Sequence, residues 1–236
     1  MKQRGGILEN MSALAIVALF VGLSSGQDDP LARHVYPLSK PLPVPVINVD
    51  TSDIPTAKAW GDKAKEVVIA WYPMVTSLLA TETWKAPKEI NIVIKKEISA
   101  PAWAAGNTIT VSGKWITEHP DDLGVMVHEL THIVQSYPRN KVDTGWLVEG
   151  IADYVRWWRY EPEAPRPRIN PEKAKYTDAY RTTAYWLAWV SRKYDMRLVP
   201  ALDGALRKGD DPMPIFEKFT KKKADELWKE FIDSKP

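Results

Sequence analysis

Two pairs of polar side chains, each at a four-residue spacing, restrict most strongly how this chain can fold. Residues 128–132 read His-Glu-Leu-Thr-His, and residues 149–153 read Glu-Gly-Ile-Ala-Asp. Positions i and i+4 lie on one face of a helix, so each segment predicts a helix with two polar side chains on the same side. The 17 residues from His132 to Glu149 allow the first helix to end and a second to return beside it. The sequence therefore predicts two adjacent helices whose polar faces meet.

Such a meeting of imidazoles and carboxylates predicts a metal site. Neutral imidazoles are good zinc ligands, so we expect His128 and His132 to bind Zn²⁺ with Glu149 as the third ligand. Asp153 lies one turn beyond Glu149, where it can accept a hydrogen bond from the non-ligating nitrogen of one histidine. Three protein ligands leave one position open, as in catalytic zinc sites. The alternative is that both pairs lie by chance on solvated or core helix faces.

Glu129 and a tyrosine are the candidates for the chemical steps. Glu129 follows the first histidine, so it is expected to face the open position, where a carboxylate can take a proton from a zinc-bound water and pass it to the leaving amine. A donor for the developing oxyanion is also needed. Tyr176, Tyr180 and Tyr185 lie near the start of a later helix and are candidates, with a packing role as the equal alternative.

The first 47 residues are predicted to lie outside the folded domain. Residues 1–26 combine two early cations, a short apolar run at 12–21 and small residues at 24–26, which predicts a secretory signal peptide. An uncleaved anchor is the alternative, although a membrane span needs about 20 apolar residues. Residues 27–47 hold five prolines and are interpreted as a leader or linker, either a spacer or a short pro-segment. A single domain is then expected over residues 48–236, outside the cell or in the periplasm.

The composition excludes some kinds of partner and ligand. The chain has no cysteine, so a metal must be held by histidine, carboxylate or backbone oxygen. A net charge of only +2 gives no concentrated basic face for nucleic acid. We expect no stable membrane association after signal cleavage, and a monomer.

Hydrophobic periodicity predicts an α+β domain that is mostly helical, with a small sheet ahead of the histidine helix. Pro73 is expected to kink or divide the first helix, and Gly150 to admit close approach of the histidine helix. Strands are predicted at 89–95 and 108–112. Helices are predicted at 56–79, from about 121 to 137, at 145–160, at 174–193 and in two shorter pieces near the C-terminus.

Three stretches carry a family resemblance. Residues 128–132, 145–156 (Gly-Trp-Leu-Val-Glu-Gly-Ile-Ala-Asp-Tyr-Val-Arg) and 176–184 (Tyr-Thr-Asp-Ala-Tyr-Arg-Thr-Thr-Ala) resemble the basic secretory protein family, the peptidases of plants and bacteria. The resemblance extends over residues 48–232 and implies a zincin-like metallopeptidase fold, a secreted enzyme and Tyr180 as the oxyanion donor. The pattern is also similar to the thermolysin-like gluzincins, whose glutamate ligand is carried onto Glu149. This chain is barely basic, unlike the family's name.

The leading hypothesis is a secreted zinc endopeptidase that acts on peptides or proteins, with Glu129 as the general base. The alternative is a secreted cell-wall or glycan-binding protein with a structural zinc site, which would use some of the 11 tryptophans as an aromatic surface. An intact Glu129 argues against that alternative, because a structural site needs no base. An exopeptidase ranks lower. Trp103, in a turn near a predicted edge strand, is a candidate for the rim of the cleft.

Overall fold

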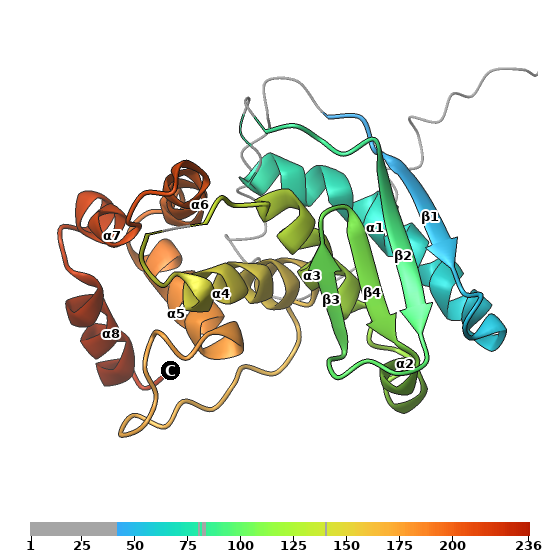
Figure 1. Ribbon diagram of the computed structural model, residues 1–236. Coiled ribbons are helices and arrows are strands. Elements are labelled where there is room, and N and C mark those ends of the chain that lie inside the picture. The colour runs from blue at the N-terminus through green and yellow to red at the C-terminus, as the bar shows by residue number, and fades with distance from the viewer. Residues whose placement is uncertain (1–41, 80, 82–83, 140) are drawn as a thin grey trace, which may run out of the picture.

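A four-stranded sheet lies beside a group of helices in the computed structural model, which describes residues 42–79, 81, 84–139 and 141–236 (Figure 1). The predicted signal peptide at 1–26 and most of the predicted leader lie outside these residues. None of the helices in the described part of the chain combines the length and the apolar character that crossing a membrane requires.

The sheet has the order β1-β2-β4-β3, in which the first three strands are parallel and β3 is antiparallel to β4. The strands are β1 (Val46–Asp50), β2 (Glu89–Lys95), β3 (Ala102–Ala105) and β4 (Thr108–Ser112). The two predicted strands correspond to β2 and β4. β1 begins at Val46, inside the segment that we expected to be leader, because the prolines stop at residue 45 and an alternating Val-Ile-Asn-Val pattern follows. β3 has an Ala-rich sequence with little strand propensity, so the sequence did not reveal it. Trp103, which we expected in a turn, lies within this strand.

One face of the sheet forms much of the core. Ile92 pairs with Ile109 and Ile94 with Val111, and all four side chains are fully buried. The helices α1 (Lys58–Leu79) and α3 (Gly124–Gln135) pack against the sheet. A short 3-10 turn, η2 (Pro55–Ala57), precedes α1. The first two layers of the fold are therefore the sheet and the α1/α3 pair.

Pro73 does not divide α1, which is a single helix of 22 residues. The missing bond of Pro73 falls on the carbonyl of Ile69, and Ile69 is 41 % exposed, so this break in the hydrogen-bond ladder lies on the solvent side. The Thr76 hydroxyl also donates to the Tyr72 carbonyl at 2.8 Å within the same turn.

The remaining helices form the half of the molecule away from the sheet (Figure 1). They are α4 (Gly145–Val155) with a π-helical continuation η3 (Arg156–Tyr160), α5 (Tyr180–Lys193), α6 (Leu198–Lys208), α7 (Met213–Thr220) and α8 (Ala224–Asp233). Three helices close the chain where we predicted two, and α5 starts six residues later than predicted. A short helix, α2 (Gly113–Glu118), also precedes α3 and was not predicted.

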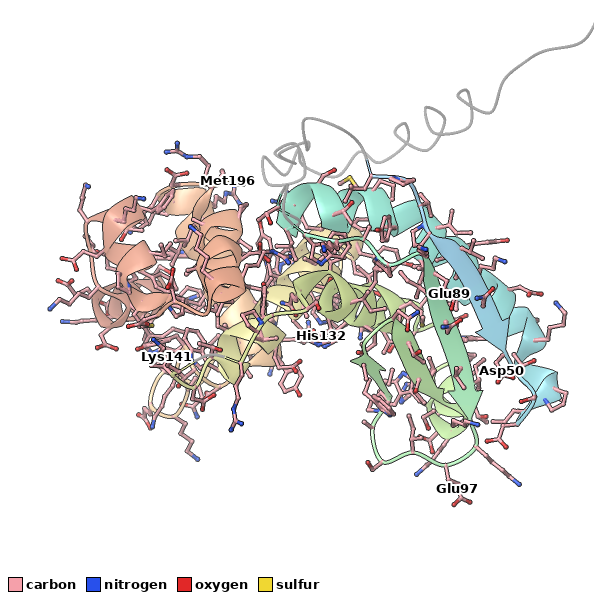
Figure 2. All side chains as sticks on the ribbon, turned by 45° about the horizontal axis from the view of Figure 1, so that its top comes forward. Asp50, Glu89, Glu97, His132, Lys141 and Met196 are labelled. Carbon is pink, nitrogen blue, oxygen red and sulfur yellow. The ribbon has the colours of Figure 1, made fainter. Side chains whose placement is uncertain are left out.

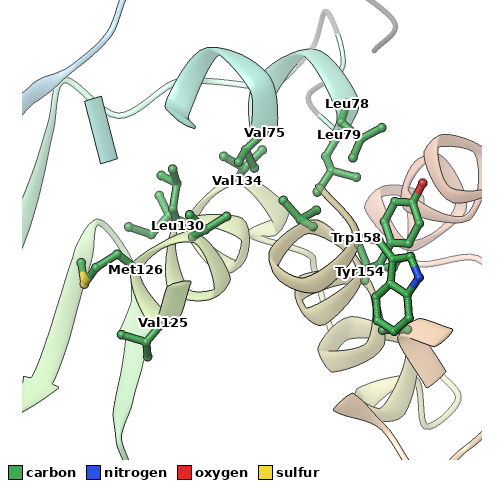
Figure 3. Close-up of a cluster of buried hydrophobic side chains, with 14 of the residues drawn as sticks. Val75, Leu78, Leu79, Val125, Met126, Leu130, Val134, Tyr154 and Trp158 are labelled. Atoms are coloured by element: carbon green, nitrogen blue, oxygen red, sulfur yellow. The ribbon is translucent and has the colours of Figure 1, made fainter. Parts of the chain in front are cut away.

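Apolar side chains of α1, α4 and the histidine helix α3 meet in one buried cluster (Figure 3). Val75 and Leu79 of α1, Leu130 and Val134 of α3, and Tyr154 of α4 are each no more than 2 % exposed. Because interiors are close-packed, this cluster fixes the axis of α3 relative to α4.

Arg207 of α6 holds the C-terminal ends of α1 and α3 together. Its guanidinium donates to the carbonyls of Leu79, Val134 and Gln135 at 3.1, 2.8 and 3.1 Å. The side chain of Asp203, which is 1 % exposed, pairs with the same guanidinium at 2.8 Å. The last carbonyls of a helix have no intrahelical partner, so Arg207 supplies donors where two helices end. Tyr137 also donates to Asp203 at 2.7 Å.

Candidate metal centre

Three potential ligand atoms converge between α3 and α4, as the two spacings predicted. The Nε2 atoms of His128 and His132 lie 3.1 Å apart, and the Oε2 atom of Glu149 lies 3.2 Å from the first and 3.4 Å from the second. Ligands about 2.0–2.2 Å from a tetrahedral ion lie about 3.3 Å from each other. Within the described residues, this is the group of three that can hold a metal ion. His132 lies in the middle of the molecule, between the sheet and the C-terminal helices (Figure 2).

Hydrogen bonds on the far side of each imidazole leave its Nε2 atom free to bind a cation. The Nδ1 atom of His128 lies 2.8 Å from Oδ1 of Asp153, and the Nδ1 atom of His132 lies 2.7 Å from Oε1 of Gln135. Both partners accept hydrogen bonds, so both Nδ1 atoms carry the proton in the neutral rings. Two lone pairs and a carboxylate oxygen then face one another, an arrangement that a cation stabilises.

A proton takes the place of such a cation when no metal is bound. Burial lowers the pKa of His128, but its hydrogen bonds with Asp153 and Glu149 outweigh this effect and raise the pKa to about 9. Burial raises the pKa of Glu149, yet its hydrogen bonds to the two histidines outweigh it and lower the pKa to about 2. The site thus holds positive charge at neutral pH, by proton or by metal.

Gln135 is a supporting residue that sequence reasoning missed. It lies on the same helix as His132, three residues later, and is 1 % exposed. Its Nε2 group donates to the carbonyl of Val148 in α4 at 3.0 Å, which orients the amide so that its oxygen faces His132. The spacing His-x-x-Gln was the available signal, since i and i+3 are neighbours on a helix.

Glu129 lies beside the converging atoms without joining them. It is 5 % exposed, and its Oε2 atom is buried with no hydrogen-bond partner among the described residues. The backbone N–H of Ala104 in β3 interacts with its carboxylate. Burial raises the pKa of Glu129, although His128 and His132 oppose the shift. A carboxylate with one free oxygen and a raised pKa is suited to taking up a proton.

Tyr180 is the tyrosine that reaches the site. Its ring is nearly parallel to that of His128, with the centroids 6.3 Å apart, and it is 55 % exposed. Negative charge on Glu149 raises the pKa of its hydroxyl, followed by burial and by Asp153 and Glu129. The other two candidates pack among aromatic side chains. The ring centroid of Tyr176 lies 4.8 Å from that of Trp186, and the ring centroid of Tyr185 lies 5.1 Å from that of Phe231.

A strained backbone brings Tyr180 to this position. Ala179 has φ 64° and ψ −173°, a region used almost only by glycine, and Tyr180 follows with φ 46°. This turn ends the loop before α5 and explains why the helix predicted from residue 174 starts only at Tyr180. Thr183 donates to the carbonyl of Tyr176 at 2.6 Å, which holds the loop against the first turn of α5.

Gly150 admits close packing, but of α5 and not of α3 as we expected. A Cβ atom at this position would lie 2.2 Å from Cγ2 of Thr183. The glycine beside Glu149 therefore lets the helix that carries Tyr180 approach the helix that carries Glu149.

The family is decided by a match over most of the chain. Residues 56–231 match the model of the family described as peptidases of plants and bacteria. The chain belongs to this family. No curated protein and no solved structure matches it significantly.

The resemblance to this family noted in the sequence is thus confirmed, and the family's description implies substrates that are peptides or proteins. Its potential metal ligands line a cleft of about 700 Å³. The cleft is bounded by the segment from Ala100 to Ala104, by Trp115 and Val125, and by residues of α4, η3 and α5. Trp103, the predicted rim residue, lines this cleft and is 47 % exposed.

Proposed function

We propose that the protein is a secreted zinc endopeptidase with a zincin-like fold, in which His128, His132 and Glu149 hold the ion. The observation that carries the proposal is the convergence of three electron-pair donors at tetrahedral spacing, next to a buried carboxylate that has one free oxygen. Two imidazoles and a carboxylate favour Zn²⁺ over the hard cations, which prefer oxygen ligands only. Asp153 and Gln135 orient the two imidazoles.

Glu129 acts in this proposal as the general base and then as the acid. A bound zinc ion would supply a Lewis acid that acidifies water and polarises the scissile carbonyl. The Glu129 carboxylate takes the proton of the attacking water on its free oxygen and delivers it to the departing amine nitrogen. Its raised pKa favours this transfer, because a carboxylate with a higher pKa is a stronger base.

Tyr180 is proposed to stabilise the oxyanion. Its hydroxyl lies on an exposed ring that faces the cleft and is not committed to a protein partner by any hydrogen bond that the described residues make. The raised pKa of the phenol keeps the hydroxyl protonated, so it can donate to negative charge that develops on the carbonyl oxygen.

The edge strand β3 is proposed to bind the substrate backbone. Within the described sheet, β3 pairs with β4 alone, so no strand covers its other edge. The backbone N–H of Ala104 on this strand interacts with the Glu129 carboxylate, which supports a place for the strand beside the proposed general base. A peptide that adds to this edge in extended form would lie along the cleft with its backbone groups paired.

The structure gives little support to the alternative of a glycan-binding surface. Such a surface needs several exposed aromatic rings, whereas Trp60, Trp158 and Trp186 are no more than 7 % exposed. Trp103 is the tryptophan that stands out as exposed among the described residues, and it belongs to the cleft. We also propose a signal peptide at residues 1–26 and a leader that ends at β1.

Metal analysis together with hydrolysis of an unfolded protein such as casein tests the proposal. We expect one zinc per chain in the wild type and in Glu129→Gln, with hydrolysis by the wild type only, because the variant keeps the ligands and loses the base. Glu66→Gln, at an exposed position on α1, is the matched control and should retain full activity. Stoichiometric zinc without hydrolysis of any of several unfolded substrates would overturn the peptidase mechanism.

A further inference from the structure

One wall of the cleft carries two guanidinium groups on a single indole. Arg156 and Arg181 each place the Cζ atom 4.2 Å from the centroid of the Trp157 ring. All three residues line the cleft that contains Glu129 and the converging ligand atoms. A guanidinium on an aromatic face is held in one plane, so fewer degrees of freedom are lost when it binds an anion.

The guanidinium of Arg156 forms ion pairs with two carboxylates of the protein. Its Nη2 group lies 2.5 Å from Asp122, its Nε group lies 3.3 Å from Glu161, and its side chain is 13 % exposed. Asp122 also accepts a hydrogen bond from the Trp115 indole at 3.1 Å. Arg156 therefore ties η3 to the segment before α3, and its charge is compensated by these two carboxylates.

Arg181 lacks such a partner. Among the residues that the structure describes, no carboxylate lies within ion-pair distance of its guanidinium, and its one hydrogen bond goes to the carbonyl of Pro165. Its Nε atom is buried without an acceptor. The carboxylate of Glu161 is hydrogen-bonded to Arg156 and interacts with Arg181 only electrostatically, beyond ion-pair distance.

The position of Arg181 beside Tyr180 sets where an anion would bind. Tyr180 stacks on His128, and Arg181 is the next residue on the first turn of α5. A peptide that is cut at the metal centre would therefore bring the side chains that flank the scissile bond close to this guanidinium. An uncompensated, partly buried arginine in a peptide cleft is a recognition site for carboxylate.

We propose that Arg181 is a specificity-determining residue that binds a carboxylate of the substrate on one flank of the cut bond. This inference rests on the proposed peptidase function and adds a substrate class to it. The carboxylate belongs either to an aspartate or glutamate side chain or to the C-terminus of the peptide. The Glu/Gln and free/amidated peptide pairs described below separate these two sources.

The test measures kcat/KM on matched peptides. Each pair carries Glu or Gln at one of the two positions on either side of the cut bond, with either a free or an amidated C-terminus. We expect the wild type to prefer one carboxylate by about tenfold or more, the usual effect of a charge-assisted hydrogen bond. The preference should fall to about one in Arg181→Gln and reverse in Arg181→Glu. Arg192→Gln, at an exposed position of α5, is the charge-matched control and should keep the wild-type preference.

The outcomes separate the two levels of the proposal. Cleavage without any carboxylate preference, or a preference that survives in Arg181→Gln, overturns the role of Arg181 and leaves the peptidase intact. A preference lost on C-terminal amidation assigns the carboxylate to the chain end, and one lost on Glu-to-Gln exchange assigns it to a side chain. Calorimetric binding of the same peptides to Glu129→Gln gives a readout independent of turnover. Equal dissociation constants for each carboxylate peptide and its neutral counterpart in that variant would overturn the inference even if no peptide were cleaved.

Discussion

Two buried aspartates support the histidine helix in different ways. Asp153, 5 % exposed, lies 2.8 Å from an imidazole nitrogen of His128 at the candidate metal centre. Asp203, 1 % exposed, lies 2.8 Å from the guanidinium of Arg207, which holds the carbonyls at the end of α3. Each aspartate belongs to a pair spaced four residues apart, with Glu149 in the first case and Arg207 in the second.

The difference between them lies in what the partner does. His128 turns its other nitrogen, Nε2, toward the cleft, so Asp153 acts on an atom of the proposed metal site. Arg207 donates to three backbone carbonyls as well as to Asp203, so Asp203 acts on the packing of helix ends. The same residue type in a similarly buried pair should therefore affect metal binding in one place and fold stability in the other.

The largest expected effect is that of Asp203→Ala. Removing one partner of a buried ion pair leaves an uncompensated charge, which costs about 3–5 kcal/mol of unfolding free energy. Denaturant unfolding should show this loss, while zinc bound per folded molecule stays at the wild-type value. The double variant Asp203→Leu/Arg207→Met, which removes both charges, should lose less than Asp203→Ala. A loss below about 1 kcal/mol in the single variant would show that this pair does not hold the helix ends.

Acid should affect the Asp203 pair in a defined direction. Burial raises the pKa of Asp203 from its ordinary 3.8 to about 6, although Arg207 and Tyr137 oppose the shift. A carboxyl with a raised pKa in the folded state contributes stability below its unfolded pKa, and that contribution is lost as pH rises through the folded value. The unfolding free energy of the wild type should therefore fall by about 2 kcal/mol relative to Asp203→Asn between pH 4 and pH 7. A constant difference across this range would contradict the shift.

Asp153→Ala should act mainly on the metal. Loss of the acceptor for His128 should weaken zinc binding by about 10–100-fold, since the imidazole loses its orientation and basicity. The unfolding free energy of the metal-free protein should fall by only about 1–3 kcal/mol, the effect of one unpaired buried donor. Competition with a zinc chelator gives the affinity. Asp153→Asn keeps an acceptor, so its zinc affinity should lie between those of the wild type and Asp153→Ala. Unchanged affinity in Asp153→Ala would show that Asp153 does not support the metal site.

Gln135→Leu sharpens the contrast with a neutral support. His132 loses the acceptor for its Nδ1 proton, and Val148 loses a donor, but no charge is removed. Zinc affinity should fall by about tenfold or less, a smaller effect than that of Asp153→Ala. The same chelator competition measures this affinity. If Gln135→Leu lowers zinc affinity as much as Asp153→Ala or more, the negative charge of Asp153 does not make its support of His128 stronger than the support of His132 by Gln135.

Ala179→Gly is expected to have the smallest effect, because it alters neither buried pair. Glycine adopts the observed backbone conformation without strain, so the unfolding free energy should rise by about 1 kcal/mol after the greater unfolded-state freedom of glycine is included. Zinc affinity should not change. At the ordinary helical position of Ala70 in α1, the same substitution should destabilise by about 1 kcal/mol. Destabilisation by Ala179→Gly would show that the turn is not strained.

Local spacing explains what could be predicted from the sequence. The convergence of His128, His132 and Glu149, and the approach of Asp153 to His128, follow from two four-residue spacings and a short connection. Strands β2 and β4 follow from alternation of β-branched residues. These features depend on neighbours a few positions apart, which a single sequence displays directly.

Contacts between distant segments explain what the sequence did not reveal. In the sequence, Asp203 and Arg207 resemble an ordinary pair on the surface of a helix. In the structure, Arg207 donates to the carbonyl of Gln135, which lies 72 residues earlier in the chain. The free edge of β3 becomes visible only when Ala-rich residues pair with β4. Ala179 carries no sign of its backbone conformation in the sequence, because alanine by itself disfavours a positive φ.

A crystal structure of the zinc-loaded protein, with anomalous diffraction collected at the zinc edge, tests the central claim most directly. We predict a single anomalous peak between α3 and α4. The ion should lie about 2.0–2.2 Å from the Nε2 atoms of His128 and His132 and from a carboxylate oxygen of Glu149, with a water in the fourth position beside Glu129. A peak elsewhere, or an ion that is bound by the histidines while Glu149 remains outside coordination distance, would contradict the three-ligand site.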